Sequence, residues 1–505
     1  MISGMKDTAI LKKDDIVVID ITDLDAEGQG IGKAEGLTLF VKDAFVGDKV
    51  EVKIMKMKKA YGFARLMNVI TPSKERIKPA CPIARACGGC QLQEISYEAE
   101  LKFKENKVRN NLIRIGGFEE SFIDRIKEPI VGMEKPLRYR NKAQYPVGRD
   151  KNGKIIAGFY AGRTHAIIPA EDCLLGREHN KEILGAVLSY MEETGVEPYD
   201  EGTAKGLVRH VLIREGFTSG EIMVCLVVNG TKLPKEDYLI SKIRASLLNP
   251  EEADAVKSIC LNTNTRKDNV IMGDKTRVLY GSGTIKDSLC GLTFKISPLS
   301  FYQVNPVQAA RLYEKAVEYA DLTGKESVWD LYCGIGTISL VMAKNAKTVY
   351  GVEIIPEAIH DAKENAKRNG ISNAEFFVGK AEEVLPQFYQ STETDGEMKS
   401  PDVIVVDPPR KGCDEKCLET MLLMKPKRIV YVSCDSATLA RDLKILCAKD
   451  YTLTKWQGYD QFSRTVHVEC CVLLERVSNR KADSYVKLNV KMEDYYKFKD
   501  AKVEQ

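Results

Sequence analysis

The sequence contains no stretch of about 18 consecutive apolar residues, the length that a membrane-spanning helix needs. Its amino terminus, Met1-Ile-Ser-Gly-Met-Lys-Asp7, also lacks the apolar segment of a secretory signal peptide. Net charge is nearly absent as well, because 75 Lys and Arg residues oppose 72 Asp and Glu residues among the 505. We therefore expect a cytoplasmic protein without a membrane partner, and the net charge does not indicate what it binds.

One segment departs from this neutral balance. Residues 53–78 contain eight Lys or Arg residues and a single acidic residue, Glu75. Such a run is either a solvated basic face or a surface that contacts phosphate groups, and the sequence favours neither.

The chain has 14 cysteines. In a long chain without a signal peptide, this number argues against a disulfide scaffold and for reduced thiols, metal ligands or a catalytic nucleophile. We expect most of them to be inert core residues.

Hydrophobic periodicity divides the chain into three folded regions and a tail. Short alternating stretches separated by glycines over residues 14–71 predict a small β-barrel, a fold that often holds nucleic acid. Strands mixed with helices near residues 97–112 and 181–194 predict a central α+β domain. From residue 305 strands and helices alternate, which predicts a doubly wound parallel sheet of the α/β class. The expected boundaries are 1–72, 73–297 and 298–479, with a peripheral charged tail at 480–505.

A glycine loop follows the first strand of the predicted α/β region. In Asp330-Leu-Tyr-Cys-Gly-Ile-Gly336 the glycines precede a helical pattern, so the backbone can turn tightly against a ligand. Glu353 ends the next strand, where a carboxylate can accept both ribose hydroxyls of a nucleoside cofactor. NAD-binding loops usually carry a third glycine at the position of Ser339, and this loop closely resembles that of S-adenosylmethionine-dependent methyltransferases. The methyl donor is therefore expected rather than NAD.

Two later segments place a carboxylate and a thiol at neighbouring strand ends: Asp407-Pro-Pro-Arg410 and Cys434. Amino-group methylases of bases typically end this motif with an aromatic residue, so Arg410 makes amino methylation the weaker interpretation. A uracil C5 becomes nucleophilic only after a thiolate adds to C6, which requires a cysteine. A helix predicted after Cys434 can favour the thiolate through its amino end, although a lone cysteine here is more often structural.

Together these segments resemble the bacterial RNA uracil-C5 methyltransferase family over roughly residues 14–475. The resemblance implies a Rossmann-like class I methyltransferase domain in which Cys434 is the nucleophile and Glu469 the base. The amino-terminal barrel resembles the TRAM module, an OB-like RNA-binding barrel. The motifs that carry the resemblance are Phe301-Tyr-Gln-Val-Asn305, the glycine loop, Asp407-Pro-Pro-Arg-Lys-Gly412, Tyr431-Val-Ser-Cys-Asp-Ser-Ala-Thr-Leu-Ala-Arg-Asp-Leu443 and Val466-His-Val-Glu469.

By the same resemblance, Gln303, Tyr332, Glu353 and Asp407 line the site for S-adenosylmethionine. The expected chemistry also needs a base, because the C5 proton must leave before the thiolate is eliminated. Glu469 is suitable in type, but its spacing does not show that it approaches Cys434. Without the resemblance, an exposed carboxylate on a terminal strand is the simpler interpretation, and His467 on the same face is the second candidate.

Cys81, Cys87 and Cys90 lie close together and, with the distant Cys173, offer four soft ligands. Soft thiolates suit zinc or an iron–sulfur cluster, and a metal-free chain is the third alternative. Cys87-Gly-Gly-Cys-Gln91 resembles the cluster loop of the ribosomal RNA branch of the family, which implies a 4Fe–4S cluster with a structural or RNA-binding role.

The resemblance also bears on the RNA. The family's transfer RNA enzymes usually lack both the barrel and the cysteine cluster, so a 23S ribosomal RNA uridine is the leading target and a transfer RNA uridine the alternative. The base must leave its stack to reach Cys434, and Arg138-Tyr-Arg-Asn-Lys142 is a candidate RNA contact.

Two further alternatives are weaker. RNA cytosine-C5 methylases generally carry a second cysteine inside the Asp-Pro-Pro motif, whereas here Cys413 lies just after it. A non-catalytic RNA-binding protein predicts degraded motifs, yet the glycine loop, Asp407 and Cys434 are intact.

Overall fold

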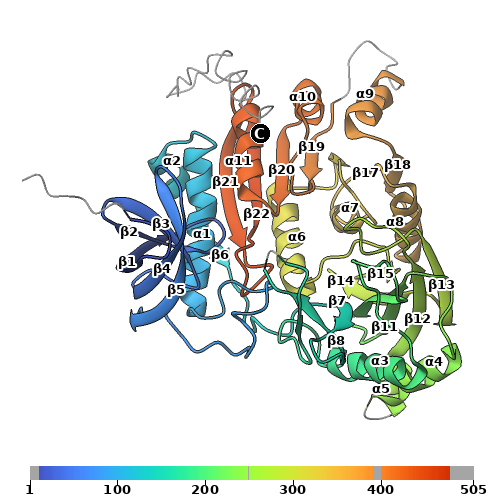
Figure 1. The fold of residues 1–505 in the computed structure, drawn as a ribbon. Helices are drawn as coiled ribbons and strands as arrows, with labels where there is room; N and C mark the ends of the chain where they lie inside the picture. The colour runs from blue at the N-terminus through green and yellow to red at the C-terminus, as the bar shows by residue number, and fades with distance from the viewer. Residues whose placement is uncertain (1–10, 163, 248–249, 392–399, 478–505) are drawn as a thin grey trace, which may run out of the picture.

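The computed structural model describes residues 11–162, 164–247, 250–391 and 400–477, so the tail expected at 480–505 lies outside the described residues. Three larger bodies make up the fold: a closed barrel, a seven-stranded sheet and an eight-stranded sheet (Figure 1). Within these ranges, none of the helices combines the length and apolar character needed to cross a lipid bilayer.

The barrel confirms the predicted amino-terminal fold. Its order is β1-β2-β3-β5-β4, formed by β1 (Ile16–Leu24), β2 (Gly30–Ala34), β3 (Leu37–Lys42), β4 (Lys49–Met57) and β5 (Tyr61–Thr71). Alternate residues such as Ile19, Leu39, Val52 and Ala64 fill its interior, while their neighbours face outward.

The central sheet has the order β13-β12-β11-β10-β7-β8-β9. Helices α3 (Asn180–Thr194) and α4 (Glu236–Ala245) pack together beside it, next to the short α5 (Pro250–Ala255). The inner strand β11 is buried at every residue, which explains its continuous apolar sequence Ile-Met-Val-Cys-Leu-Val-Val. The strands are β7 (Lys142–Arg149), β8 (Ile155–Tyr160), β9 (Ile167–Pro169), β10 (Val208–Glu215), β11 (Ile222–Val228), β12 (Val256–Thr263) and β13 (Lys275–Gly281).

The eight-stranded sheet has the order β18-β17-β16-β19-β20-β22-β21-β6. Its first five strands are parallel and β22 runs antiparallel to β20, so the predicted doubly wound sheet is confirmed. The chain order reverses between β16 and β19, the switch point at which such sheets bind ligands. The strands are β6 (Lys127–Val131), β16 (Ser327–Asp330), β17 (Thr348–Glu353), β18 (Ala374–Val378), β19 (Val403–Val406), β20 (Arg428–Ser433), β21 (Tyr451–Tyr459) and β22 (Glu469–Arg476).

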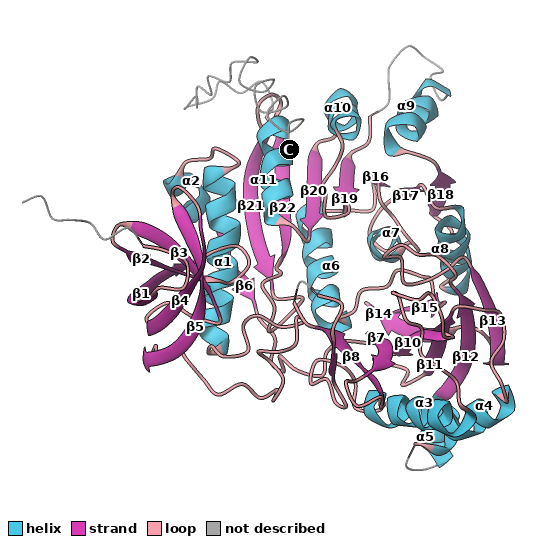
Figure 2. Cartoon of the chain, viewed as in Figure 1, coloured by secondary structure: helices cyan, strands magenta, loops and turns pink. Residues whose placement is uncertain are grey.

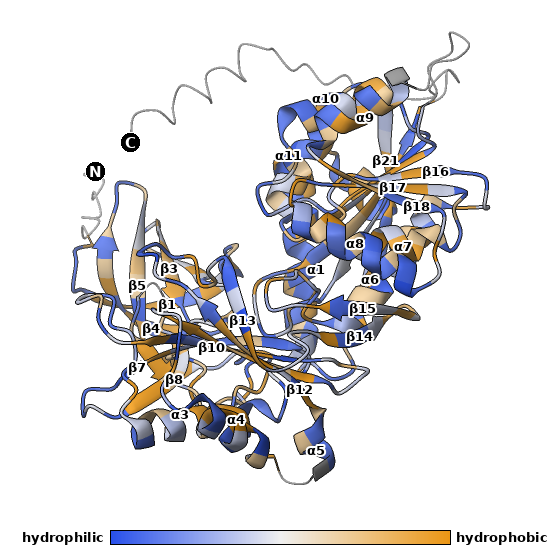
Figure 3. Ribbon diagram, turned by 90° about the vertical axis from the view of Figure 1, so that its right-hand side faces the viewer, coloured by the Kyte–Doolittle hydropathy of each residue, from blue (hydrophilic) through white to orange (hydrophobic). Residues whose placement is uncertain are grey.

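Helices cover both faces of this sheet (Figure 2). One apolar core joins the sheet to α6 (Pro306–Ala320), α7 (Thr337–Ala343) and α8 (Pro356–Arg368). A second core joins the opposite face to α9 (Ala381–Ser391), α10 (Glu415–Met424) and α11 (Ser436–Leu446). Successive residues of β16 alternate between the cores, Val328 entering the first and Trp329 the second. Apolar colouring follows the strands, and polar colouring follows the outer turns of helices such as α8 (Figure 3).

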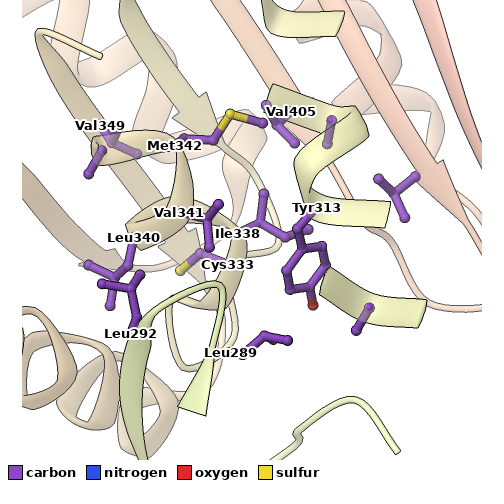
Figure 4. Packing of buried hydrophobic residues seen from close by; sticks show 14 of the residues in the cluster. Leu289, Leu292, Tyr313, Cys333, Ile338, Leu340, Val341, Met342, Val349 and Val405 are labelled. Atoms are coloured by element: carbon purple, nitrogen blue, oxygen red, sulfur yellow. The ribbon is translucent and has the colours of Figure 1, made fainter. Parts of the chain in front are cut away.

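A two-stranded hairpin, β14 (Ile285–Leu289) and β15 (Leu292–Ile296), connects the central region to the large sheet. Its Leu292 lies beside Leu340 of α7, and Leu289 lies near Tyr313 of α6 (Figure 4). This apolar contact anchors the segment that leads into residues 301–305.

One part of the chain crosses between the expected domains. Helix α1 (Tyr97–Arg114) packs against α11, and β6 pairs in parallel with β21 at the edge of the large sheet. The short α2 (Glu120–Arg125) connects them. Residues 97–131, which fall inside the expected 73–297 domain, therefore lie on the eight-stranded sheet and bring the barrel beside it (Figure 1).

Candidate active site

The carboxyl ends of the central parallel strands gather the expected site residues at one edge of the sheet. Asp330 and Glu353 end β16 and β17, while Asp407 and Cys434 follow β19 and β20 directly. This clustering follows from parallel topology, because parallel strands end at the same edge.

The glycine loop adopts the tight conformation expected from its sequence. Gly334 and Gly336 have positive φ angles of 53° and 83°, a backbone region that favours glycine. A Cβ on Gly336 would approach the Phe376 ring and the Ala362 methyl group at 3.2 and 3.3 Å. The amide of Gly334 donates to Glu353 Oε2 at 3.3 Å, so the loop and the Glu353 carboxylate meet.

Ser339 occupies the position at which an NAD-binding loop would have its third glycine. Its hydroxyl donates to Asp330 Oδ2 at 2.6 Å, which fixes the carboxylate beneath the loop. Burial nevertheless raises the pKa of Asp330 to about 6. Burial, reinforced by the negative charge of Asp330, raises the pKa of Asp407 to about 7.

Gln303 and Tyr332 occupy different surroundings. Gln303 is buried, and its Oε1 accepts a hydrogen bond at 3.2 Å from Gln461 Nε2. Its backbone carbonyl accepts from Asn141 Nδ2 at 3.0 Å, which ties residues 301–305 to the start of the central sheet. Tyr332 is half-buried and packs on the α10 side of the sheet, close to Cys417.

Cys434 is half-buried at the end of β20. Burial, with added repulsion from Glu469 and Asp407, raises the pKa of its thiol to about 12, and Arg410 opposes this shift. Burial thus outweighs any effect of the helix that follows. Asp435 caps that helix, α11, by accepting from the amides of Ala437 and Thr438 at 2.9 and 3.0 Å, and its charge adds to the rise in the Cys434 pKa.

Glu469 is the first residue of β22, and it is buried. In the antiparallel ladder Ser433 pairs with Cys470, which sets Glu469 beside Cys434. Burial and repulsion from Asp407 raise the pKa of Glu469 well above its usual range, while Arg410 again opposes the shift. The alternative of an exposed terminal carboxylate is thus wrong, and the two expected catalytic residues are neighbours.

His467 has a less suitable environment for a base. Burial and several nearby cations, first among them Arg410, lower its pKa to about 4. Arg410 is the charged group that sequence reasoning underused: it acts on Cys434, His467 and Glu469 alike. Its position at the end of the Asp-Pro-Pro-Arg motif was the available signal.

The four expected metal-ligating cysteines line one cavity of about 230 Å³, together with Arg140, Lys142 and Val304. All four are partly buried. Burial raises the pKa of Cys90 to about 12. Within the described ranges, no group of three or more His, Cys, Asp or Glu side chains is arranged to hold a metal ion.

Known RNA methyltransferases are similar to this chain over most of its length. The family described as tRNA (Uracil-5-)-methyltransferase matches residues 261–477, and the TRAM domain matches residues 15–67. An uncharacterized RNA methyltransferase of Halalkalibacterium halodurans is 47% identical over 470 residues, which cover 93% of this chain and 99% of that protein. The chain belongs to the RNA uracil-5-methyltransferase family.

Further similarity supports this assignment. An uncharacterized RNA methyltransferase of Clostridium tetani is 45% identical over 94% of this chain and all of its own. The crystal structure of Pyrococcus abyssi tRNA (uracil-54, C5)-methyltransferase in complex with S-adenosyl-L-homocysteine superposes with a TM-score of 0.71. Its identity is 26%, and the match covers 91% of this chain and 100% of that chain.

Several expectations are settled by family membership. The protein is an S-adenosylmethionine-dependent RNA methyltransferase with a class I fold, and its barrel is a TRAM domain. Its activity is methylation of uracil C5 in RNA. The alternatives of amino methylation, cytosine methylation and a non-catalytic RNA-binding protein are thereby set aside.

Proposed function

We propose that this methyltransferase converts a uridine of 23S ribosomal RNA to 5-methyluridine, with Cys434 as nucleophile and Glu469 as base. The observation that carries the catalytic assignment is the pairing of Ser433 with Cys470, which leaves Cys434 and Glu469 side by side at the active edge of the sheet. The nucleophile must reach C6 and the base must reach the proton on the adjacent C5 of one pyrimidine ring. Neighbouring positions for Cys434 and Glu469 satisfy both needs.

The reaction begins when the Cys434 thiol gives its proton to solvent water and the sulfur adds to C6 of the flipped uracil. The electron pair of the C5–C6 double bond moves toward C5 and O4 and forms an enolate. C5 then takes the methyl group from the sulfonium of S-adenosylmethionine, which leaves as S-adenosylhomocysteine. The Glu469 carboxylate removes the C5 proton, the C6–S bond breaks, and the thiolate is regenerated.

Protonation states link the two residues. In the free protein the pKa of about 12 keeps the Cys434 thiol protonated near neutral pH, and burial raises the pKa of Glu469 as well. Arg410 is the cation that favours the charged form of each. We assign it the role of a positioning residue that makes thiolate formation and proton removal accessible near pH 7.

Gln303, Tyr332, Glu353 and Asp407 are proposed to line the methyl-donor site. Glu353 has the clearest role: its contact with the Gly334 amide orients the carboxylate at the end of β17, where it can accept the ribose hydroxyls. Asp407 lies at the same edge of the sheet, between Glu353 and Cys434. This position suits a residue that contacts both the methyl donor and the target uracil.

We also propose that Cys81, Cys87, Cys90 and Cys173 hold a 4Fe–4S cluster. Four sulfur donors from separate segments around one cavity fit the ligand chemistry of such a cluster. When bound, the cluster would supply a rigid cross-link and not an electron for the methyl transfer. The residues around it would fix the loop 81–90 against Arg140 and Val304.

The choice of RNA is supported by the cysteine loop, which resembles that of the ribosomal RNA branch. The barrel gives little support for ribosomal RNA over transfer RNA, because a tRNA enzyme from Pyrococcus abyssi superposes on 91% of this chain. That similarity keeps a transfer RNA uridine as the second candidate substrate.

The test is nucleoside mass spectrometry after anaerobically purified protein and S-adenosylmethionine are incubated with unmodified 23S ribosomal RNA and, separately, with unmodified transfer RNA. We expect 5-methyluridine in the ribosomal RNA only. The same product confined to transfer RNA would overturn the substrate and keep the chemistry.

A further inference from the structure

The outer face of the barrel carries three aromatic rings in mutual contact. Phe40 of β3 lies 5.8 Å from Tyr61 and 5.6 Å from Phe63, both of β5, between ring centroids. Tyr61 and Phe63 are 5.7 Å apart and nearly perpendicular, at 84°. None of the three belongs to the buried core of the barrel, and Tyr61 is 39% exposed. The barrel interior therefore does not account for this group of rings.

Strand pairing places basic side chains among these rings. Phe63 pairs with Phe40 on one side and with Lys56 of β4 on the other, and Arg65 pairs with Lys42 two residues further along. Among the residues that the structure describes, Lys56 and Arg65 form no ion pair. These residues belong to the basic segment 53–78, for which the sequence left a solvated face and a phosphate-binding surface equally open.

The rings also line an open hollow of about 710 Å³, together with residues of the turn at 25–29 that include the acidic Asp25 and Glu27. A second hollow, also of about 710 Å³, begins at the same turn, because Asp25 and Ala26 line both. It follows α1 past Asn106 to Asn111. The Asn111 side chain donates to Ser436 Oγ at 2.8 Å, two residues beyond Cys434. The second hollow therefore lies between the barrel and α1, on the side of the barrel that adjoins the eight-stranded sheet.

We propose that the Phe40, Tyr61 and Phe63 rings form a stacking site for one unpaired base of the substrate RNA. Lys56 and Arg65 contact the phosphates on either side of that base. Aromatic rings interleaved with unpaired cations match a single strand, which offers π faces and phosphates in alternation. The inference rests on RNA being the substrate and is independent of which RNA is methylated.

The experiment uses the full-length protein and measures fluorescence anisotropy with a fluorescein-labelled 12-nucleotide oligouridylate. Phe63→Leu keeps apolar bulk but removes the stacking face, and we expect its Kd to rise roughly 5- to 100-fold. Phe63→Trp should bind within about twofold of the unchanged protein, because it restores a ring. Val18→Ala alters an exposed apolar residue on β1, outside the residues that line the hollow, and should leave Kd unchanged.

An equal Kd for Phe63→Leu and the unchanged protein would overturn the stacking site. An equal rise in Kd for Phe63→Leu and Phe63→Trp would also overturn it. Thermal unfolding midpoints check each variant, and Tyr61→Leu replaces Phe63→Leu if the latter does not fold. Lys56→Gln should flatten the salt dependence of binding by about one phosphate contact. A protein that shows this pattern yet methylates neither RNA would retain the stacking site and lose the proposed reaction. Normal methylation by the unchanged protein, together with unaltered RNA binding by Phe63→Leu, would retain the proposed reaction and exclude the stacking site.

Discussion

Cys434 and Glu469 flank the same end of the antiparallel ladder between β20 and β22, next to the paired residues Ser433 and Cys470. The ladder makes neighbours of two residues that are far apart in the sequence. It also exposes the Cys434 thiol to the charge of Glu469, which contributes to the raised pKa of that thiol. Their separate roles in addition and in proton removal give the first prediction.

Glu469→Gln should stall the reaction after methyl transfer, because the amide cannot remove the C5 proton while Cys434 can still add to C6. We expect the variant to retain RNA in a covalent complex that survives denaturing gel electrophoresis, with turnover reduced by at least about 100-fold. Cys434→Ala should give neither product nor complex. A Glu469→Gln enzyme with normal turnover would remove this residue from the mechanism.

Arg410→Gln should shift the dependence of activity on pH. Arg410 lowers the pKa of both Cys434 and Glu469, so its removal raises both values, and the charged forms appear only at higher pH. The rising limb of the plot of kcat/KM against pH should move to higher pH. The kcat/KM values of the variant and the unchanged protein should converge at alkaline pH. Arg410→Lys, which keeps the charge, should restore most of the profile. An equal loss at every pH would indicate a role in binding alone.

The sequence predicted the barrel and the doubly wound sheet because their periodicities are local properties of each strand. It also predicted that Asp407 and Cys434 share an edge, since parallel strands end together. The position of Glu469 was not predictable from spacing, because it depends on the register of β22. The raised pKa of Cys434 was likewise not predictable, because its largest cause is burial, which depends on tertiary packing.

Glu353→Gln should weaken binding of the cofactor product. The carboxylate accepts from the Gly334 amide and is proposed to accept from the ribose, and hydrogen bonds to a charged group are worth about 1.5–3 kcal/mol. Calorimetric titration with S-adenosylhomocysteine should therefore show a Kd about 10- to 100-fold higher. Glu357→Gln, on the exposed first turn of α8, is the matched control. Unchanged affinity of Glu353→Gln would exclude the ribose contact.

Cys90→Ser should lower the iron and acid-labile sulfide content of anaerobically purified protein from about four atoms each toward zero. The thiol lines the cavity shared by the four cysteines, and a serine hydroxyl is a poor ligand for iron in a cluster. Cys447→Ser, at the end of α11 and outside that cavity, should keep the full content. Zinc without iron in the unchanged protein would contradict the cluster assignment.

Lys104→Met should destabilise the junction between α1 and the loop that leads into β22. Lys104 is fully buried, bonds Glu100 at 2.7 Å and Asp460 as well, and donates to the Phe462 carbonyl at 3.0 Å. Loss of its charge leaves the buried Asp460 carboxylate without a cation and leaves Glu100 with Arg464 alone, at 3.5 Å, which costs about 3–5 kcal/mol. We expect a lower thermal midpoint and reduced activity, because the same loop carries the chain to Glu469. Lys102→Met, an exposed position on the same helix, should change stability by no more than about 0.5 kcal/mol. Equal midpoints for the two variants would show that the buried lysine does not hold this loop in place.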